Sequence, residues 1–379
     1  FIFLIVYLNR LFKFCFTMIY KDITILLTVY NRPNFTKKWL DYANETKLPF
    51  KIFIADGGND NQVSSILKKN NYKNIQINYN KFKHYTGFKN FFEKFHKSCL
   101  KIKSKFIYIC EDDDFIYPKN ILKSYYFLKK NSDYSCSGGV NFRYRSFKLQ
   151  NKLLNYFHLQ DKGINKPIKD NSSLDRLINL FSNLDSHWNC LHRKKSLIYT
   201  FNYMSKKNFF NYLLTENIFI AFTTFYGKIN RFNHIEYLKT NEISQSSSYI
   251  FSNKGYKKFF FHKSKKSELN YFFDKIKVNK KDKKKINIFK KIFINKFFEY
   301  EKMLLKREKF FPKIISLIRY FLVYILKKIN IFYFLKYIKL KFYHTFKDGL
   351  YFDSLTSYNL YKKNRNFIKR VILFNERNT

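Results

Sequence analysis

Four consecutive carboxylates follow a short apolar run in the middle of the chain. The run is Phe106–Cys110, and Glu111, Asp112, Asp113 and Asp114 come directly after it. A short run rich in β-branched and aromatic residues is typical of a buried strand and is too short for a helix. Adjacent carboxylates repel one another, and the cost grows where the end of a strand removes them from water. The sequence therefore predicts either a fully exposed acidic turn or a site that holds a cation.

Strand-like and helix-like segments alternate on either side of this run. The segment 23–30 is continuously apolar and β-branched, as central parallel strands are. Alternating strands and helices predict an α/β fold with a Rossmann-like, mostly parallel sheet flanked by helices. The predicted order is strand 23–30, helix 35–44, strand 50–55, helix 62–69, strand 75–79, helix 87–102, strand 106–110 and helix 120–130.

Polar clusters follow three of the predicted strands. Tyr30–Arg32 ends the first, Asp56–Gly58 ends the second, and Glu111–Asp114 ends the fourth. The carboxyl ends of parallel strands line the ligand crevice of such sheets. Three polar clusters at neighbouring strand ends therefore predict one common site.

The pattern after residue 136 is less regular. Gly138 and Gly139 predict a turn, and the segments 174–181 and 208–227 predict helices. The serine-rich segment 244–248 predicts a flexible loop.

The charge of the chain bears on its partners. A formal net charge of +46 over 379 residues predicts attraction to nucleic acid, anionic lipid or phosphorylated substrates. Lys, Asn, Ile, Phe and Tyr all have A/T-rich codons and are all abundant here, so a nucleotide bias is an equally good explanation. The five cysteines show neither zinc-site nor disulfide spacing, which favours a reducing cytoplasm.

The chain opens with an apolar segment. It begins with Phe1, and Arg10 and Lys13 interrupt it well short of the roughly 20 residues that span a bilayer. We expect the natural start at Met18 and interpret residues 1–17 as an upstream or non-native segment. A truncated signal peptide is the alternative.

The composition changes near residue 250. The segment 250–379 is rich in aromatic residues, and its basic residues greatly outnumber its acidic ones. Apolar residues recur at helical spacing over 286–304, which predicts an amphipathic helix. The more apolar segment 314–342 is broken by charges and fails as a membrane span. The extension is therefore expected to pack on the rest of the chain, to lie on anionic lipid, or to contact nucleic acid.

Four motifs in this order resemble the family-two glycosyltransferases. They are Thr28–Arg32, Ile54–Gly58, Gly87–Asn90 and Cys110–Phe115. Within the family, the order is similar to the bacterial "glycosyltransferase domain" subgroup associated with surface-polysaccharide synthesis. The resemblance spans roughly residues 20–245 and implies a GT-A fold. It implies that 18–249 is a nucleotide-sugar-binding catalytic domain and that 250–379 is a basic helical extension outside it.

The resemblance implies a divalent metal, Mg²⁺ or Mn²⁺, at the acidic run. Transfer of a sugar from a nucleotide diphosphate requires the charge of the leaving diphosphate to be neutralised, which a carboxylate-held metal does as a Lewis acid. Asp113 is the expected metal ligand, and Asp112 is expected to face the ribose or to share the metal. Glu111 and Asp114 would support them.

The same resemblance implies a nucleotide pocket at the first two strand ends. Asp56 matches the aspartate that accepts an N–H from a uracil-type base. An Asx turn before Gly57 is the structural alternative for this residue. Thr28, Tyr30 and Arg32 would edge the pocket, and Arg32 could pair with a phosphate.

An inverting transfer also needs a base that takes the proton of the acceptor hydroxyl. Glu216 matches the position best, although the usual Glu-Asp pair is Glu-Asn here, and Asp185 is the second candidate. Either acid could instead cap a helix or form an ion pair. We expect Trp188 to fill core, and His187 and His192 to be structural.

Together these features predict a cytoplasmic, metal-dependent, inverting glycosyltransferase. Its donor would be a nucleotide sugar such as a UDP-sugar, and its acceptor a surface glycan or a lipid-linked glycan. Residues 280–345 would attach it to the anionic inner face of the membrane. A nucleic-acid-binding protein or a metal-dependent nucleotidyltransferase is the alternative from another class, but acids gathered at a crevice repel phosphate, so a nucleic-acid partner is not expected. An inactive homologue is the third interpretation.

Overall fold

The computed structural model describes residues 20–84, 87–149, 152–159, 166–183, 186–240, 265–276, 282–308, 345–347 and 350–377. Four features predicted from the sequence lie outside these residues. They are the segment 1–17, the candidate base Asp185, the loop at 244–248 and the apolar segment 314–342.

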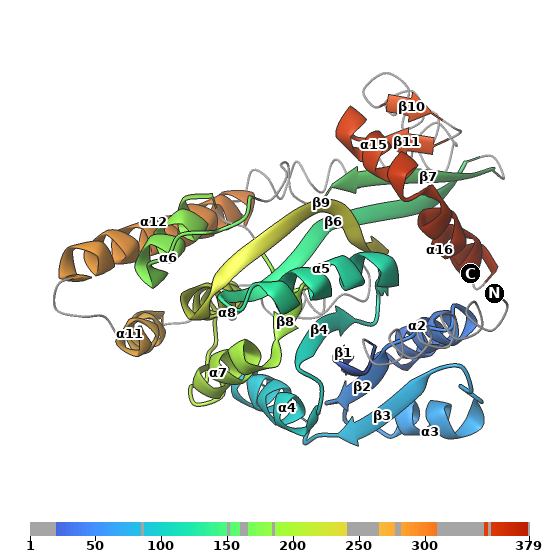
Figure 1. The fold of residues 1–379 in the computed structure, drawn as a ribbon, viewed down its shortest axis with the longest axis horizontal. Helices are drawn as coiled ribbons and strands as arrows, with labels where there is room; N and C mark the ends of the chain where they lie inside the picture. The colour runs from blue at the N-terminus through green and yellow to red at the C-terminus, as the bar shows by residue number, and fades with distance from the viewer. Residues whose placement is uncertain are drawn as a thin grey trace, which may run out of the picture.

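Four parallel strands form one half of the central sheet, in the order β3-β2-β1-β4 (Figure 1). They are β1 (Ile23–Val29), β2 (Lys51–Asp56), β3 (Gln76–Lys81) and β4 (Phe106–Glu111). The helices α2 (Pro33–Glu45), α3 (Gln62–Lys69) and α4 (Phe88–Lys101) connect them in sequence. The predicted α/β class is therefore confirmed, and α3 has the predicted bounds.

Both faces of β1, β2 and β4 are buried, which explains their continuous apolar runs, whereas β3 at the edge of the sheet is only partly covered. Ile25 of β1 belongs to a core cluster shared with α2, α3 and α5 (Pro118–Lys130). Its neighbour Leu26 belongs to a second cluster, shared with α4, on the opposite face. Because the chain reverses direction along the sheet after β3, α4 crosses on the face opposite α2 and α3. The strand order thus has a switch point between β1 and β4, which is where ligands bind in sheets of this kind.

The other half of the sheet is mixed, so the prediction of a mostly parallel sheet holds only for the first half. β8 (Leu191–Arg193) pairs antiparallel with β4 and with β6 (Tyr134–Leu149). β6 pairs antiparallel with β7 (Lys152–Leu159) and parallel with β9 (Lys228–Thr240). The short β5 (Asp114–Ile116) pairs antiparallel with β9.

The turn predicted at Gly138 and Gly139 is wrong, because both residues lie inside β6. A Cβ at Gly138 would stand 2.3 Å from Cys190 Sγ, and one at Gly139 would stand 2.2 Å from the His234 carbonyl oxygen. The register of β6 against β9 also shifts at this point. These glycines therefore permit a close approach of neighbouring backbone in a strand, which is the other common use of glycine.

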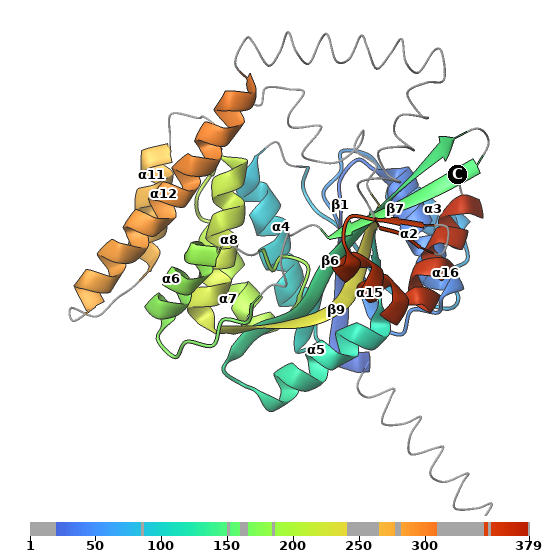
Figure 2. The ribbon, with the colours of Figure 1, turned by 90° about the horizontal axis from the view of Figure 1, so that it is seen from above.

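Three further helices cover the face that α4 occupies. They are α6 (Ser173–Asn183), α7 (Lys194–Met204) and α8 (Tyr212–Tyr226). α11 (Lys265–Lys275) and α12 (Lys283–Glu308) lie alongside them (Figure 2). The ring of Phe293 on α12 contacts Phe181 on α6, with centroids 4.7 Å apart. The predicted amphipathic helix is confirmed, and its apolar side packs on the rest of the chain.

The last described residues pack on the other end of the sheet. They form β10 (Thr345–Lys347), β11 (Leu350–Phe352), α15 (Leu355–Lys363) and α16 (Arg365–Arg377). β11 pairs with β7, and α16 lies beside α2 (Figure 1). Phe374 contacts Tyr42 of α2 at 5.3 Å between ring centroids. Among the described helices, none is long and apolar enough to cross a membrane.

Candidate functional site

The three polar clusters predicted from the sequence meet at one edge of the sheet. In the register of the parallel strands, Val29 lies beside Asp56, and Thr28 lies beside Glu111. The half-buried Thr28 thus sits next to the acidic run, at the switch point between β1 and β4. The expectation of one common site at the carboxyl ends of these strands agrees with this arrangement.

The acidic run forms a tight, buried connection between β4 and β5. Asp112, Asp113 and Asp114 are 4%, 5% and 0% exposed, and Glu111 is half-buried. The indole Nε1 of Trp39 donates to the carbonyl oxygen of Asp114 at 2.7 Å, which fixes the connection to α2. An exposed acidic turn is therefore excluded, and the negative charges must be balanced within the protein.

Arg32 balances two of these carboxylates across the switch point. Its Nη1 is 3.1 Å from Asp112 Oδ1, and its Nη2 is 3.7 Å from Asp113 Oδ2. Thr36 Oγ1 donates to the second oxygen of Asp112 at 3.2 Å. Burial still raises the pKa of Asp112 to about 7, against the opposing charge of Arg32. Arg32 Nε and Nη2 are buried with no hydrogen-bond partner among the described residues, so the guanidinium retains donors for a further anion.

Lys239, which lies on β9, balances the charge of the remaining carboxylates. Its Nζ is 2.7 Å from Glu111 Oε2, 3.5 Å from Asp114 Oδ1 and 3.6 Å from Asp113 Oδ1. Burial alone would lower the pKa of Lys239, but the three carboxylates together outweigh burial and hold this pKa well above its ordinary value. Lys239 in turn lowers the pKa of Glu111. Lys239 is therefore charged and lies in the middle of the acidic group.

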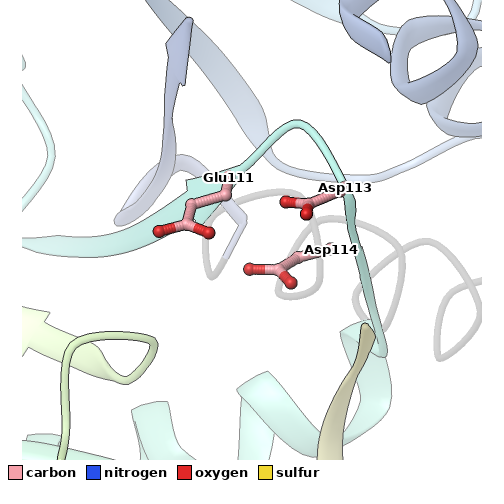
Figure 3. A group of neighbouring side chains, drawn as sticks. All are labelled: Glu111, Asp113 and Asp114. Atoms are coloured by element: carbon pink, nitrogen blue, oxygen red, sulfur yellow. The ribbon is translucent and has the colours of Figure 1, made fainter. Parts of the chain in front are cut away.

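Three of the acids could hold a metal ion. Glu111, Asp113 and Asp114 each offer one carboxylate oxygen, and these oxygens lie within 4.8 Å of one another (Figure 3). Oδ1 of Asp113 and Oδ1 of Asp114 are buried and accept no hydrogen bond from any described residue. Hard oxygen donors left without hydrogen bonds suit Mg²⁺ or Mn²⁺, so these residues fit the metal that the sequence predicted. Asp112 lies outside this group and contacts Arg32 and Thr36, so its part at the metal or the ribose stays a prediction.

Asp56 is buried at the end of β2, and its carboxylate is already in use. The Gly58 N–H donates to Asp56 Oδ1 at 2.8 Å, which is the Asx turn given above as the alternative. Tyr79 Oη and Lys81 Nζ, both on β3, lie 2.8 and 3.0 Å from Oδ2. Recognition of a base by Asp56 stays a prediction.

The mouth of the site near β1 is aromatic and tightly turned. Tyr30 is half-buried, and its ring is stacked on His84 with centroids 5.6 Å apart and planes at 11°. Asn31 has a φ of 51°, a left-handed conformation that asparagine adopts more readily than most residues. Its side-chain oxygen accepts a hydrogen bond from Asn59 N at 2.9 Å. The ends of β1 and β2 are thereby joined.

Three polar residues of the site escaped the sequence analysis. Lys94 on α4 is 2% exposed, its Nζ lies 3.5 Å from the Val29 carbonyl oxygen, and burial lowers its pKa to about 7. Asn189 Nδ2 donates to Asp114 Oδ2 at 2.7 Å, and Lys239 has been described above. The one signal for Lys94 is its place on the apolar face of the predicted helix. Nothing local in the sequence connects Asn189 or Lys239 to the acidic run.

Of the two candidate bases, Glu216 and Asp185, only Glu216 lies within the described residues. Glu216 lies on α8 with an exposed side chain, and its role stays a prediction, as does that of Asp185. Trp188 packs against the core, with its ring 4.4 Å from that of Phe219, as expected. The buried His192 contacts the Trp188 carbonyl oxygen through Nε2 at 3.2 Å, consistent with a structural role.

Comparisons with known proteins give weak likenesses. No family model matches the chain, and no curated protein matches its sequence. Residues 1–349 of TarS from S. aureus are similar at 12% identity and a TM-score of 0.39, over 76% of this chain and 93% of that one. The same fragment in complex with UDP-GlcNAc has 10% identity and the same TM-score and coverage. The mannosyltransferase PcManGT from Pyrobaculum calidifontis, in complex with GDP-Man and Mn²⁺, has 8% identity and a TM-score of 0.39, over 85% of this chain and 87% of that one. Such low values assign neither a family nor an activity to the chain.

Proposed function

We propose that the chain is a glycosyltransferase that takes a sugar from a nucleotide-diphosphate donor bound at the carboxyl ends of β1, β2 and β4. The observation that carries the proposal is the buried group of Glu111, Asp113 and Asp114 beside Arg32, at the switch point of the sheet. It agrees with the resemblance of the strand-end motifs to the family-two glycosyltransferases.

Glu111, Asp113 and Asp114 would hold the divalent cation, either Mg²⁺ or Mn²⁺. When bound, the cation supplies positive charge that stabilises the departing diphosphate. Arg32 would add to this charge, because Nε and Nη2, which have no hydrogen-bond partner among the described residues, can donate to a phosphate oxygen while Nη1 stays on Asp112. Asp112 thus positions the guanidinium in this proposal.

The nucleoside would lie toward β1 and β2. Tyr30 and His84 offer a stacked aromatic pair at this edge, and Thr28 lies between it and the acidic group. Asp56 is held by Tyr79 and Lys81, so it would orient the base either directly or through the loop that begins at Gly57. A UDP-sugar is the donor that the uracil-type recognition favours.

The transfer step would invert the anomeric centre. The acceptor hydroxyl attacks the anomeric carbon, the bond from that carbon to the diphosphate breaks, and a carboxylate takes the hydroxyl proton. Glu216 would be this base, with Asp185 as the alternative. The acceptor would be a surface glycan or a lipid-linked glycan.

Attachment to an anionic membrane surface is a second part of the proposal. One exposed side of α12 carries Lys284, Ile288, Lys291 and Phe298 at helical spacing, and Ile288 and Phe298 are 49% and 41% exposed. Basic and apolar side chains on one side of a helix suit an anionic interface. The full chain should co-sediment with vesicles that contain phosphatidylglycerol. Lys284→Glu with Lys291→Glu should reduce this binding, and Lys362→Glu with Lys363→Glu on α15 should not. Equal binding of both variants would contradict the attachment.

A turnover screen tests the activity. Wild-type protein is incubated with UDP-, GDP- and dTDP-sugars, with and without Mn²⁺, and release of the nucleotide is measured. We expect Mn²⁺-dependent release with one donor, and loss of release in Asp113→Asn. Asp133→Asn, at an exposed carboxylate paired with Lys228, is the matched control and should retain it. The proposal fails if no donor is consumed in a metal-dependent way.

A further inference from the structure

We propose that Lys239 is an internal counter-cation that occupies the metal position of the acidic group, so that a divalent ion binds by displacing its ammonium group. The inference rests on the proposed function only for the position of the metal. It concerns the exchange of two cations and needs no nucleotide sugar.

The geometry leaves room for a single cation. The ligand oxygens of Glu111, Asp113 and Asp114 lie within 4.8 Å of one another, so an ion among them stands within about 3 Å of each. The Lys239 Nζ already stands 2.7 to 3.6 Å from all three side chains. A second positive charge in the same space would be strongly repelled. The ammonium group and a metal ion therefore exclude each other.

The ammonium group is an incomplete substitute for a metal ion. It makes a hydrogen bond to Glu111, but the facing oxygens of Asp113 and Asp114 accept no hydrogen bond among the described residues. Buried oxygens without a partner are costly, and a divalent ion could ligate both of them. Lys239 thus supplies enough positive charge for the acids to remain buried without a metal. A divalent ion would still bind more favourably, because it can ligate the two oxygens that Lys239 leaves without a hydrogen bond.

Lys239 is also placed so that its ammonium group can leave. Its backbone is paired with Asp114 between β9 and β5, so the strand can stay in place while the side chain swings. The side chain is 20% exposed, which gives the ammonium group a path to water. A lysine side chain is long and flexible, so its ammonium group can leave the site and return more readily than the planar guanidinium group of an arginine.

Binding of Mn²⁺ alone to Lys239→Met tests the exchange. Titrations followed by electron paramagnetic resonance should give an affinity for Mn²⁺ about tenfold or more above that of the wild type, because no ammonium group has to leave. Lys81→Met is the matched control, since Lys81 lies at the same edge of the sheet and pairs there with Asp56 at the end of β2. Its affinity for Mn²⁺ should match the wild type. Equal or weaker binding by Lys239→Met, or no binding by either protein, overturns the inference.

A measurement on the wild-type protein tests the inference even if Lys239→Met does not fold. Lysines are acetylated briefly with and without saturating Mn²⁺, and each site is quantified by mass spectrometry. Lys239 should become several-fold more reactive when Mn²⁺ binds, whereas Lys81 and Lys228 should not change. A Lys239 that stays protected in Mn²⁺-saturated protein overturns the inference. If Lys239 responds to Mn²⁺ but no nucleotide sugar is consumed, the exchange stands and the proposed activity falls.

Discussion

Lys239 lies directly opposite Asp114 in the antiparallel pair of β5 and β9, and its ammonium group reaches Glu111 at 2.7 Å. This contact brings a cation from β9 into an acidic group formed at the end of β4. With Arg32 on the other side, it explains how a chain can bury three adjacent aspartates.

Arg32→Lys should weaken the binding of a nucleoside diphosphate. A lysine cannot span Asp112 and Asp113 and still donate to a phosphate, so the loss should be about 1–2 kcal/mol, or roughly tenfold in Kd. Calorimetry with UDP and Mn²⁺ measures this loss. Lys37→Met, which removes an exposed lysine paired with Asp41 on α2, should leave the Kd unchanged. The same Kd for wild type, Arg32→Lys and Lys37→Met would show that Arg32 does not bind the nucleoside diphosphate.

Gly138→Ala should destabilise the fold. The added Cβ would stand 2.3 Å from Cys190 Sγ and 2.7 Å from Glu236 Oε2, so β6 or its neighbours must shift. Overpacking of this kind costs about 2–3 kcal/mol. At Gly87 the one described atom that the Cβ would meet is Asn208 Oδ1 at 3.2 Å, so Gly87→Ala should cost far less. Urea unfolding at pH 7 compares the two, and equal effects would show that the close approach in β6 carries no cost.

Phe293→Ala tests the packing of α12 on α6. Phe293 is 1% exposed and contacts Phe181 and Phe272, so its removal should cost about 3–4 kcal/mol through loss of burial and the cavity left behind. Phe298 on the same helix is 41% exposed, and Phe298→Ala should cost less than about 0.5 kcal/mol. Thermal unfolding separates the two outcomes. A Phe293→Ala protein as stable as Phe298→Ala would mean that α12 does not dock on α6.

Glu236 should give the stability a specific pH dependence. This residue is buried in β9, where its carboxyl group accepts hydrogen bonds from Gly139 N and Ser124 Oγ, and Arg231 and Tyr108 lie near it. Burial raises its pKa from 4.5 to about 7. The unfolded chain therefore releases this proton first, and stability falls as pH rises from 4.5 through 7. The stability is fully present below 4.5 and the loss levels off above about 7.

Glu236→Gln removes this titration. Relative to the wild type, the variant should gain roughly 3 kcal/mol of stability between pH 4.5 and pH 8, as a shift of this size implies. Urea unfolding across this range measures the difference. Glu299→Gln, at an exposed carboxylate on α12, is the matched control. A flat difference between Glu236→Gln and wild type would show that Glu236 does not hold its proton in the folded state.

The first half of the fold could be predicted because its signals are local. The strands β1, β2 and β4 are short apolar runs bounded by turn residues, β3 alternates apolar and polar residues, and each helix between them has its own apolar periodicity. The strand ends of a parallel sheet share one edge by construction, so Arg32, Asp56 and the acidic run could be placed together without coordinates. The sequence left the acids either fully exposed or gathered around a cation, and only the structure shows that the three aspartates are buried.

The second half depends on pairings between distant segments. β6 and β9 begin at Tyr134 and Lys228, and no local pattern says that such segments are neighbours. Glycine is common in turns, but it also permits close backbone approach inside a strand. Sequence alone does not separate these two uses, so the turn predicted at Gly138 was wrong. Lys239 could not be identified either, because its place beside the acidic run depends on the pairing of the distant strands β5 and β9. In a chain with so many lysines, only the β5–β9 register distinguishes this one.

Equilibrium binding of UDP tests the central claim most directly. The claim is that Glu111, Asp113 and Asp114 form a cation site that recruits a nucleoside diphosphate. Calorimetry of UDP, GDP and dTDP with wild-type protein should show binding of one of them that requires Mn²⁺ and disappears in Asp113→Asn, while Asp133→Asn binds normally. Binding that is independent of Mn²⁺ and unaffected by Asp113→Asn, or no binding of any nucleoside diphosphate, would contradict the claim.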